Sequence, residues 1–303
     1  MVELLDTVDY LKEGKLIFRC HNSEKERLVF QIGSSDPELA LQAALTVVKD
    51  VAGFDLNCGC PKKFSLQGGM GAALLRQPDL LCSILEKLVK CSGRPVSCKI
   101  RINQDDDVTI SLCHRIVQTG ICALTVHCRT PSQRPKDNGR WDIFPILAKE
   151  LGDFPLIANG DVFSLEHAQR LKDISGVTSF MFARAAQENP SVFRKEGLLP
   201  IFDVVKRYIE ISIKTDNVFQ NTKYALLQMW PNLNEGLGKI ILHSKSYEEV
   251  CSIFGLEQYY RDFLLQREEA AARNNWEFFL KISELYPLDN AELQERIEEK
   301  IVR

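Results

Sequence analysis

The chain has 303 residues, of which 45% are apolar and 26% are charged, a composition typical of a soluble globular protein. No apolar run reaches the ~18 residues of a membrane span, and the acidic N-terminus lacks the pattern of a secretory signal. We therefore expect a cytoplasmic protein without a membrane partner, with the nucleus and the mitochondrion left open. The ten cysteines are scattered without a CxxC pair, which favours reduced thiols and predicts no metal site.

Six short β-rich runs alternate with helical patterns along the first two thirds of the chain. The runs cover residues 27–33, 53–59, 95–101, 121–129, 154–161 and 176–184. Between them, Asp36 is expected to cap a helix that starts at Pro37, and Asp107 to cap another that ends before Gly120. This alternation predicts parallel βα units.

Polar residues stand at the carboxyl ends of these predicted strands. They are Gln31, Asn57, Lys99, His127, Asn159 and Arg184. In a (β/α) barrel this rim carries the chemistry. A doubly wound sheet would bind ligands at the same ends, but the chain has no early GxGxxG or GxxxxGK(S/T) motif, which favours the barrel.

The stretch FDLNCGCPKKFSLQGGMGAALL, residues 54–75, follows the second predicted strand. Pro61 ends the strand, and three glycines within residues 68–71 allow a loop whose backbone approaches a ligand closely. We expect Cys58 and Cys60 neither to share a metal ion nor to form a disulfide, so that one thiol points into the site. From the residues alone, a reactive Cys60 and a structural Cys60 are equally open.

The later strand ends add basic and polar side chains. We expect one of Lys99 and Arg101 to face the barrel interior and the other its outside, with an internal salt bridge as the alternative role for Lys99. His127 alone is typical of a buried structural histidine, but the other polar strand ends favour a role in the site. The segments ANGD and FAR, with Arg184, predict a phosphate site at the last two strands.

After about residue 196 the pattern becomes helical. The predicted helical segments are residues 201–217, 222–233, 246–286 and 289–303. The first part of this region, up to Lys245, carries six basic residues with Tyr208, Tyr224 and Trp230 interleaved. Aromatic residues at this spacing are typical of a helix core, with base-stacking platforms as the alternative. We therefore predict two domains, residues 1–196 and residues 197–303.

Five motifs, in this order, carry a resemblance to a known family. They are DLNCGCP with GGMGAALL downstream, CKIR, TVHCRT, IANGD and FARAAQENPSVF. In them the chain resembles the tRNA-dihydrouridine synthases, flavoproteins that reduce uridine in tRNA to dihydrouridine. FQIGSSD, FARAAQENPSVF and NTKY resemble most the eukaryotic class-two enzymes that modify position 20 of tRNA.

The resemblance implies an α/β fold, a TIM-type (β/α)8 barrel that binds FMN, followed by an all-helical domain that binds tRNA. The family begins with a strand carrying an LAPM-like segment and a second βα unit, and neither is found in this sequence. We therefore expect six of the eight strands in this chain, with the barrel domain N-terminally incomplete.

The resemblance also implies the roles of individual residues. Catalytic roles fall to Cys60, which protonates C5 of the uracil as a general acid, and to Lys99, which stabilises reduced flavin. The implied cofactor-binding residues are Gln31, Lys99, His127, Asn159, Gly160, Asp161, Ala183 and Arg184. NADPH or NADH is the implied reductant and tRNA the implied partner. The alternatives are a small-molecule FMN-dependent pyrimidine reductase and an inactive RNA-binding fragment.

Overall fold

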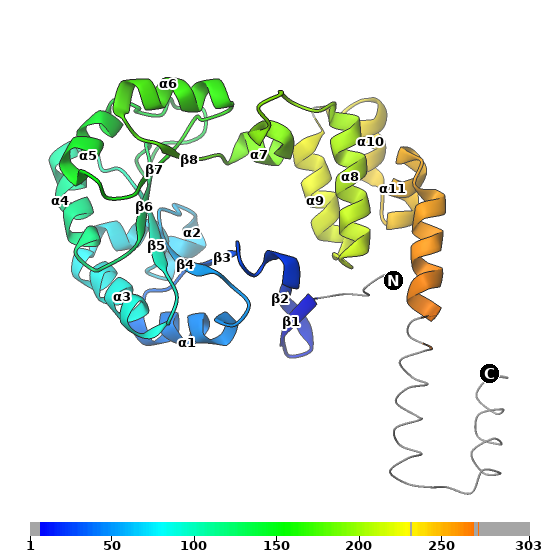
Figure 1. Cartoon of the computed structure of the whole chain (residues 1–303), viewed down its shortest axis with the longest axis horizontal. Coiled ribbons are helices and arrows are strands. Elements are labelled where there is room, and N and C mark those ends of the chain that lie inside the picture. The colour runs from blue at the N-terminus through cyan, green and yellow to red at the C-terminus, as the bar shows by residue number, and fades with distance from the viewer. Residues whose placement is uncertain (1–6, 231, 270–271, 273–303) are drawn as a thin grey trace, which may run out of the picture.

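The computed structural model describes residues 7–230, 232–269 and 272. A six-stranded parallel sheet lies at the centre of its first part, in the order β3-β4-β5-β6-β7-β8. Its strands are β3 (Val29–Ile32), β4 (Gly53–Cys58), β5 (Val96–Arg101), β6 (Ala123–His127), β7 (Leu156–Asn159) and β8 (Ser179–Met181). The main helices between them are α1 (Pro37–Val47), α3 (Pro78–Cys91), α4 (Asp106–Val117), α5 (Ile143–Leu151) and α6 (Leu165–Ser175). These helices form an arc around the outside of the sheet (Figure 1).

The six predicted strands are confirmed, each within three residues of the predicted ends. Within this sheet each strand from β3 to β7 pairs in parallel with the next one in the chain, which is the winding of a TIM-type barrel. In the part of the chain that the structure describes, β3 and β8 end the sheet and do not pair with each other. Two short elements follow the end of β4, namely α2 (Lys63–Gln67) and the 3₁₀ segment Gly71–Arg76.

Parallel register stacks the polar side chains in rows across the sheet. One row joins Gln31, Asp55 and Ser97, the next joins Asn57, Lys99 and Thr125, and the last joins Arg101, His127, Asn159 and Met181. Successive side chains alternate between faces of a strand, so residues two apart share a face. The expectation that Lys99 and Arg101 point to opposite faces is therefore wrong. In β5 both alternate with the fully buried Cys98 and Ile100, which face the surrounding helices.

Helix starts follow the capping signals, with one correction. The Asp36 side chain accepts a hydrogen bond from the Leu39 N–H and Pro37 is the first residue of α1, as predicted. In α4 the cap is Asp105, whose side chain accepts from the Asp107 N–H, and not Asp107 itself. Three consecutive aspartates each suit a cap, and the chain uses the first of them.

A second group of helices follows the sheet (Figure 1). They are α7 (Arg184–Glu188), the 3₁₀ segment Pro190–Phe193, α8 (Ile201–Lys214), α9 (Phe219–Met229), α10 (Gly236–His243) and α11 (Tyr247–Phe254). The helix predicted over 246–286 is broken by Gly255, which takes φ +64 at the end of α11, and α10 was not predicted. The segment predicted at 289–303 lies outside the described residues.

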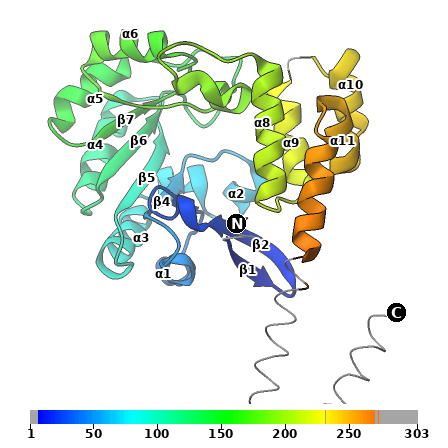
Figure 2. The same cartoon turned by 45° about the vertical axis from the view of Figure 1, so that its right-hand side comes forward.

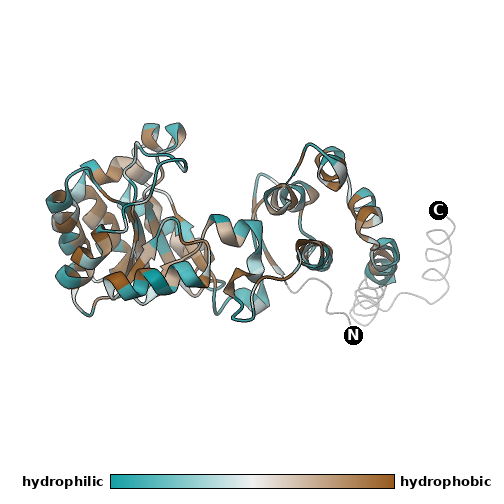
Figure 3. Ribbon diagram, turned by 90° about the horizontal axis from the view of Figure 1, so that it is seen from above, coloured by the Kyte–Doolittle hydropathy of each residue, from teal (hydrophilic) through white to brown (hydrophobic). Residues whose placement is uncertain are grey.

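Apolar side chains form two separate buried clusters, and Figure 3 shows the helices of the first part turning their apolar faces toward the sheet. One cluster fills the space between the sheet and its helices, around Leu56, Ile100 and Phe144. The other lies among α8 to α11, around Ile209, Leu226 and Phe254. The division at residues 196 and 197 stays a prediction, although no residue belongs to both clusters.

An antiparallel hairpin that the sequence did not predict precedes β3. It consists of β1 (Thr7–Lys12) and β2 (Lys15–His21), followed by the 3₁₀ turn Asn22–Glu24. Phe18 packs edge-on against Phe30 at 5.0 Å between ring centroids, while Arg19 pairs at 3.1 Å with Asp216, two residues after the end of α8. The hairpin thus contacts both the sheet and the helical group, as Figure 2 shows.

Two further findings concern the described residues. No helix among them is long and apolar enough to cross a membrane. All ten cysteines are free thiols. Cys122 is exposed, although its apolar surroundings in the sequence favour a buried position, because it lies just before β6 begins.

Candidate functional site

The turn after β4 holds Cys60 through backbone contacts. The Asn57 side-chain oxygen accepts hydrogen bonds from the N–H groups of Gly59 and Cys60 at 3.1 and 3.0 Å. The Cys60 carbonyl accepts from the Ala72 N–H at 3.0 Å. Cys60 is half-buried whereas Cys58 is fully buried, so one thiol of the motif is accessible.

The glycine loop packs on Cys60 itself rather than leaving space beside it. Gly71 takes φ +62, a conformation that side chains rarely adopt. A Cβ at Gly71 would lie 2.7 Å from the Cys60 carbonyl oxygen and 2.9 Å from the Ser65 hydroxyl. Glycine is therefore required here because the loop backbone closes over the cysteine turn.

A hydrogen-bond network of side chains from β3, β4 and β5 supports this turn. Gln31 donates to Asp55 at 2.8 Å and accepts from the Asn57 amide at 2.8 Å. The Ser97 hydroxyl also donates to Asp55 at 2.8 Å. Burial raises the pKa of Asp55, and the hydrogen bonds from Gln31 and Ser97 oppose that rise. The network fixes Asn57, which in turn fixes the backbone of Cys60.

Lys99 and Arg101 place two cations on the interior face of β5. Burial, and then the charge of Arg101, lower the pKa of Lys99 to about 8. Arg101 also lies beside the cysteine turn, because a Cβ on Gly59 would lie 3.3 Å from Arg101 Cγ. No ion pair of Lys99 with a carboxylate is found in the part of the chain that the structure describes, so the internal salt bridge considered from the sequence is not formed there.

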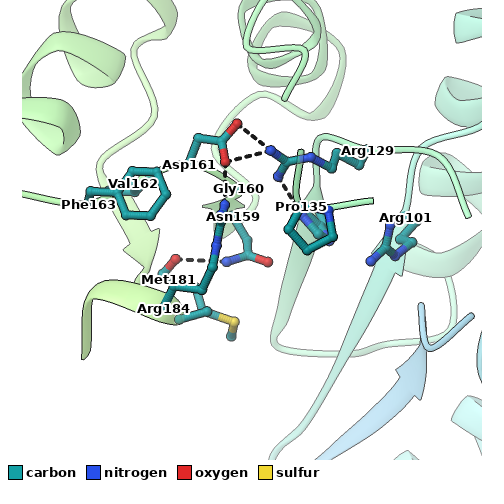
Figure 4. Close-up of a pocket in the computed structure, with 12 residues that line it drawn as sticks. Arg101, Arg129, Pro135, Asn159, Gly160, Asp161, Val162, Phe163, Met181 and Arg184 are labelled. Atoms are coloured by element: carbon teal, nitrogen blue, oxygen red, sulfur yellow. Dashed lines mark hydrogen bonds and ion pairs between the residues drawn. The ribbon is translucent and has the colours of Figure 1, made fainter. Parts of the chain in front are cut away.

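A pocket of about 210 Å³ opens at the carboxyl ends of β5 to β8 (Figure 4). Its lining residues are Arg101, His127, Arg129, Pro135, Asn159, Gly160, Asp161, Val162, Phe163, Met181, Ala183 and Arg184. A second, more open hollow of about 590 Å³ continues from it past Trp141, His167 and Arg170. Three arginines against one carboxylate make the inner pocket cationic.

Asp161 lies beside this pocket and links the chain segments that carry Arg129, Gly139 and Arg184 (Figure 4). Both of its carboxylate oxygens accept from Arg129 at 2.6 Å, one accepts from Arg184 at 2.6 Å, and the Gly139 N–H donates at 2.8 Å. Burial opposes the charge of Asp161, but these donors outweigh it and lower its pKa. The carboxylate is thus fully engaged by protein groups.

His127 and Asn159 line the same pocket in different ways. Burial, and then the charges of Lys99, Arg101 and Arg129, lower the pKa of His127 to about 3. The imidazole is therefore neutral at physiological pH. The Asn159 amide donates to the Met181 carbonyl at 2.8 Å and so ties β7 to β8.

The predicted site residues fall into two groups. Six of them share the inner pocket, namely His127, Asn159, Gly160, Asp161, Ala183 and Arg184. Gln31, Cys60 and Lys99 lie outside its lining, on the β3 to β5 side. Arg101 connects the groups, because it lines the pocket and also packs against Gly59, next to Cys60.

Sequence reasoning missed Arg129 and the network role of Asp55. Arg129 stands in TVHCRT two residues after His127, so its position next to a strand end was the available signal. Asp55 is in the interior of a β-rich run, where nothing in the sequence marks a carboxylate as part of a network.

The pocket fits a phosphate-bearing cofactor. The Gly160 backbone takes φ +118, and a Cβ there would lie 2.5 Å from the Cys128 sulfur and 3.0 Å from His127 Cδ2. Only glycine therefore allows the end of β7 to pack this closely against Cys128 and His127. The pocket lining also holds three arginines, the side chains suited to a phosphate group. Among residues 7–230 and 232–269, no three His, Cys, Asp or Glu side chains are grouped to hold a metal ion.

Comparisons with known proteins agree with the motifs. A family model described as dihydrouridine synthase matches residues 1–281. The chain belongs to the dihydrouridine synthase family. A Schizosaccharomyces pombe tRNA-dihydrouridine(20) synthase is 40% identical over 268 residues, which cover 85% of this chain and 56% of that protein. The Saccharomyces cerevisiae tRNA-dihydrouridine(20) synthase is 38% identical over 82% of this chain and 70% of its own length.

Two further comparisons are weaker. A Homo sapiens tRNA-dihydrouridine(20a/20b) synthase-like protein is 36% identical over 222 residues, 72% of this chain and 69% of that protein. Among solved structures, a dihydrodipicolinate synthase aligns with 76% of this chain and 88% of its own chain, at 10% identity. Its TM-score of 0.40 is too low to indicate a relationship. The chain thus spans little more than half the length of its S. pombe relative.

Proposed function

We propose that this dihydrouridine synthase homologue reduces a uridine of tRNA, at position 20, to 5,6-dihydrouridine with FMN and NADPH or NADH. The observation that carries the proposal is one accessible thiol, Cys60, held in a fixed turn on the same barrel face as a cationic pocket suited to phosphate. Two relatives are named as NAD(P)+-linked tRNA-dihydrouridine(20) synthases, which supports both the substrate and the reductant.

In this proposal the pocket residues hold the cofactor. Its ribityl chain and phosphate would be held by His127, Asn159, Gly160, Asp161, Ala183 and Arg184. Its ring system would lie near Gln31 and Lys99. Bound FMN, reduced by NAD(P)H, supplies a hydride to C6 of the uracil.

The chain's own groups complete the reduction. Hydride addition at C6 breaks the C5–C6 π bond and leaves an electron pair that requires a proton at C5. The Cys60 thiol donates this proton as a general acid, and the product is saturated at both carbons. The Lys99 ammonium stabilises the negative charge on the reduced cofactor. The target base must leave the tRNA stack to reach the turn of Cys60.

The test compares Cys60→Ala with Cys122→Ala, which removes an exposed thiol before β6. Each purified chain is incubated with FMN, NADPH and tRNA that lacks dihydrouridine, and the product is measured by mass spectrometry of digested tRNA. We expect Cys60→Ala to form dihydrouridine at least about 100-fold more slowly, as for loss of a general acid. Cys122→Ala should keep the wild-type rate, and both variants should keep the flavin absorbance.

Other outcomes would redirect the proposal. Full activity of Cys60→Ala would remove the role of that thiol. Turnover of free pyrimidines without tRNA turnover would indicate a small-molecule reductase instead. Salt-sensitive tRNA binding without flavin absorbance would indicate an RNA-binding chain that is not an enzyme.

A further inference from the structure

The Arg129 side chain is buried and held by several hydrogen bonds within the protein. Only 4% of it is exposed. Its Nε–H donates to the Asp137 carbonyl at 2.7 Å, and its Nη2 donates to both oxygens of Asp161 at 2.6 Å. Two loops therefore fix the plane of the guanidinium.

The remaining nitrogen of this guanidinium meets the imidazole of His127. Arg129 Nη1 lies 3.4 Å from His127 Nε2. Arginine has five N–H donors, no acceptor and a permanent charge. This contact is therefore a hydrogen bond only if Nε2 carries a lone pair, and a neutral imidazole with a free Nε2 has its proton on Nδ1.

Charged groups from every neighbouring strand face His127. Lys99 and Arg101 come from β5, Arg129 follows β6, and Asp161 follows β7. Three cations against one carboxylate disfavour a second proton on the ring, and the pKa of His127 is low for this reason as well as for its burial.

The two edges of the ring are not equivalent. The Nε2 and Cδ2 edge packs against the end of β7, because a Cβ on Gly160 would meet these atoms at 3.4 and 3.0 Å. Within residues 7–230 and 232–269 no hydrogen bond engages His127 Nδ1, and His127 lines the inner pocket.

We propose that Arg129 is a positioning residue: clamped by Asp161, it fixes His127 as the neutral tautomer with the proton on Nδ1. His127 then offers a hydrogen-bond donor to an acceptor atom of the pocket ligand and takes no proton from it. Only the identity of that ligand, an oxygen of a phosphate-bearing cofactor, rests on the proposed function. The tautomer belongs to the protein alone.

The test is ¹⁵N NMR of the histidine rings in the whole, cofactor-free chain, which has five histidines. The signals of His127 are identified as those lost in His127→Gln. We expect a protonated Nδ1 and an unprotonated Nε2 from pH 5 to 8. In Arg129→Met the tautomer ratio should move about tenfold toward Nε2–H, the effect of one hydrogen bond from a charged donor.

Arg101→Met is the matched control. Arg101 also lowers the pKa of His127, but its guanidinium donates to the Thr130 carbonyl at 2.9 Å and not to the ring. Its loss should raise the pKa of His127 without changing the tautomer. A wild-type ring protonated on Nε2, or an unchanged tautomer ratio in Arg129→Met, would overturn the proposal.

A second variant covers the case in which Arg129→Met does not fold. Asp161→Asn keeps Arg129 but weakens its clamp, and we expect a smaller shift in the same direction; an unchanged ratio would contradict the proposal. Because no cofactor is present in these samples, a failure to bind flavin would count against the proposed function and leave this result intact.

Discussion

The two sides of the site are built from different interactions. On the β4 side, Cys60 is placed by hydrogen bonds that the backbone N–H groups of Gly59 and Cys60 donate to the uncharged Asn57 side chain, and by close packing of Gly71. On the β7 side, Asp161 gathers two arginines through charged hydrogen bonds. The first arrangement fixes the position of a thiol, and the second concentrates positive charge where an anion can bind. A substitution on the β7 side should therefore mainly weaken the affinity for FMN, and one on the β4 side should mainly lower the rate of dihydrouridine formation.

The largest effect is expected from Asp161→Ala on the charged side. It leaves Arg129 buried without its carboxylate, and breaking a buried ion pair costs roughly 3–5 kcal/mol. We expect a lower free energy of unfolding and about a 100-fold weaker affinity for FMN in a fluorescence titration. Affinity for riboflavin, which lacks the phosphate, should fall much less if the arginines act on the phosphate.

Asp142→Ala provides the control for Asp161→Ala. Asp142 also pairs with an arginine, Arg140, at 2.9 Å, but its side chain is 66% exposed. An exposed pair contributes about 0–1 kcal/mol, so both measurements should stay close to the wild type. Equal losses of FMN and riboflavin affinity in Asp161→Ala would show a general loss of structure and would remove the contrast between the two sides.

A smaller effect is expected from Gly71→Ala on the neutral side. The added Cβ meets the Cys60 carbonyl in a backbone conformation that costs alanine about 1–3 kcal/mol. Displacement of the thiol should lower the rate of dihydrouridine formation by about tenfold or more, because positioning errors of ~1 Å are costly to catalysis. The affinity for FMN should change little.

Gly93→Ala is the control that separates the backbone strain of an added Cβ from its contact with neighbouring atoms. Gly93 has φ +72, similar to Gly71, but a Cβ there has no atom within 4 Å. It should lose comparable stability from its backbone and keep the full rate. If Gly93→Ala loses as much activity as Gly71→Ala, the close packing on Cys60 has no specific role.

The sequence predicted the parts of this site that depend on local pattern. Strand ends, the cap at Asp36 and the accessible Cys60 each follow from residues close together in the chain. The error on Lys99 and Arg101 came from misapplying the two-residue repeat of a strand, which places both on one face. Confirmation of the family by its model match supports the motif-based part of the reasoning.

What the sequence could not supply are contacts between distant segments. Arg129 and Asp161 are 32 residues apart, and their pairing depends on how two loops fold over the sheet. The contact of Arg19 with Asp216 spans 197 residues and required the hairpin, which local patterns did not reveal. Periodicity reports which face of an element is apolar, but not which partner a polar side chain finds.

The smallest effect is expected from Lys99→Met, which tests the strand between the two sides. Burial and the charge of Arg101 lower the pKa of Lys99 to about 8 in the folded chain, against about 10.4 when unfolded. Between these pH values the unfolded state holds the extra proton, so wild-type stability rises with pH, and this rise should be absent in the variant. At pH 7 the variant should be more stable by about 1 kcal/mol, because a buried cation that the charge of Asp55 offsets only in part is removed. Chemical denaturation at pH 7 and pH 10 measures the difference. The control is Lys90→Met, because the Lys90 side chain is 71% exposed.

A Lys99→Met variant that is less stable than the wild type at pH 7 would mean that Lys99 is paired in the folded protein. A more stable variant with slower flavin reduction would mean that the chain keeps a destabilising cation for its function.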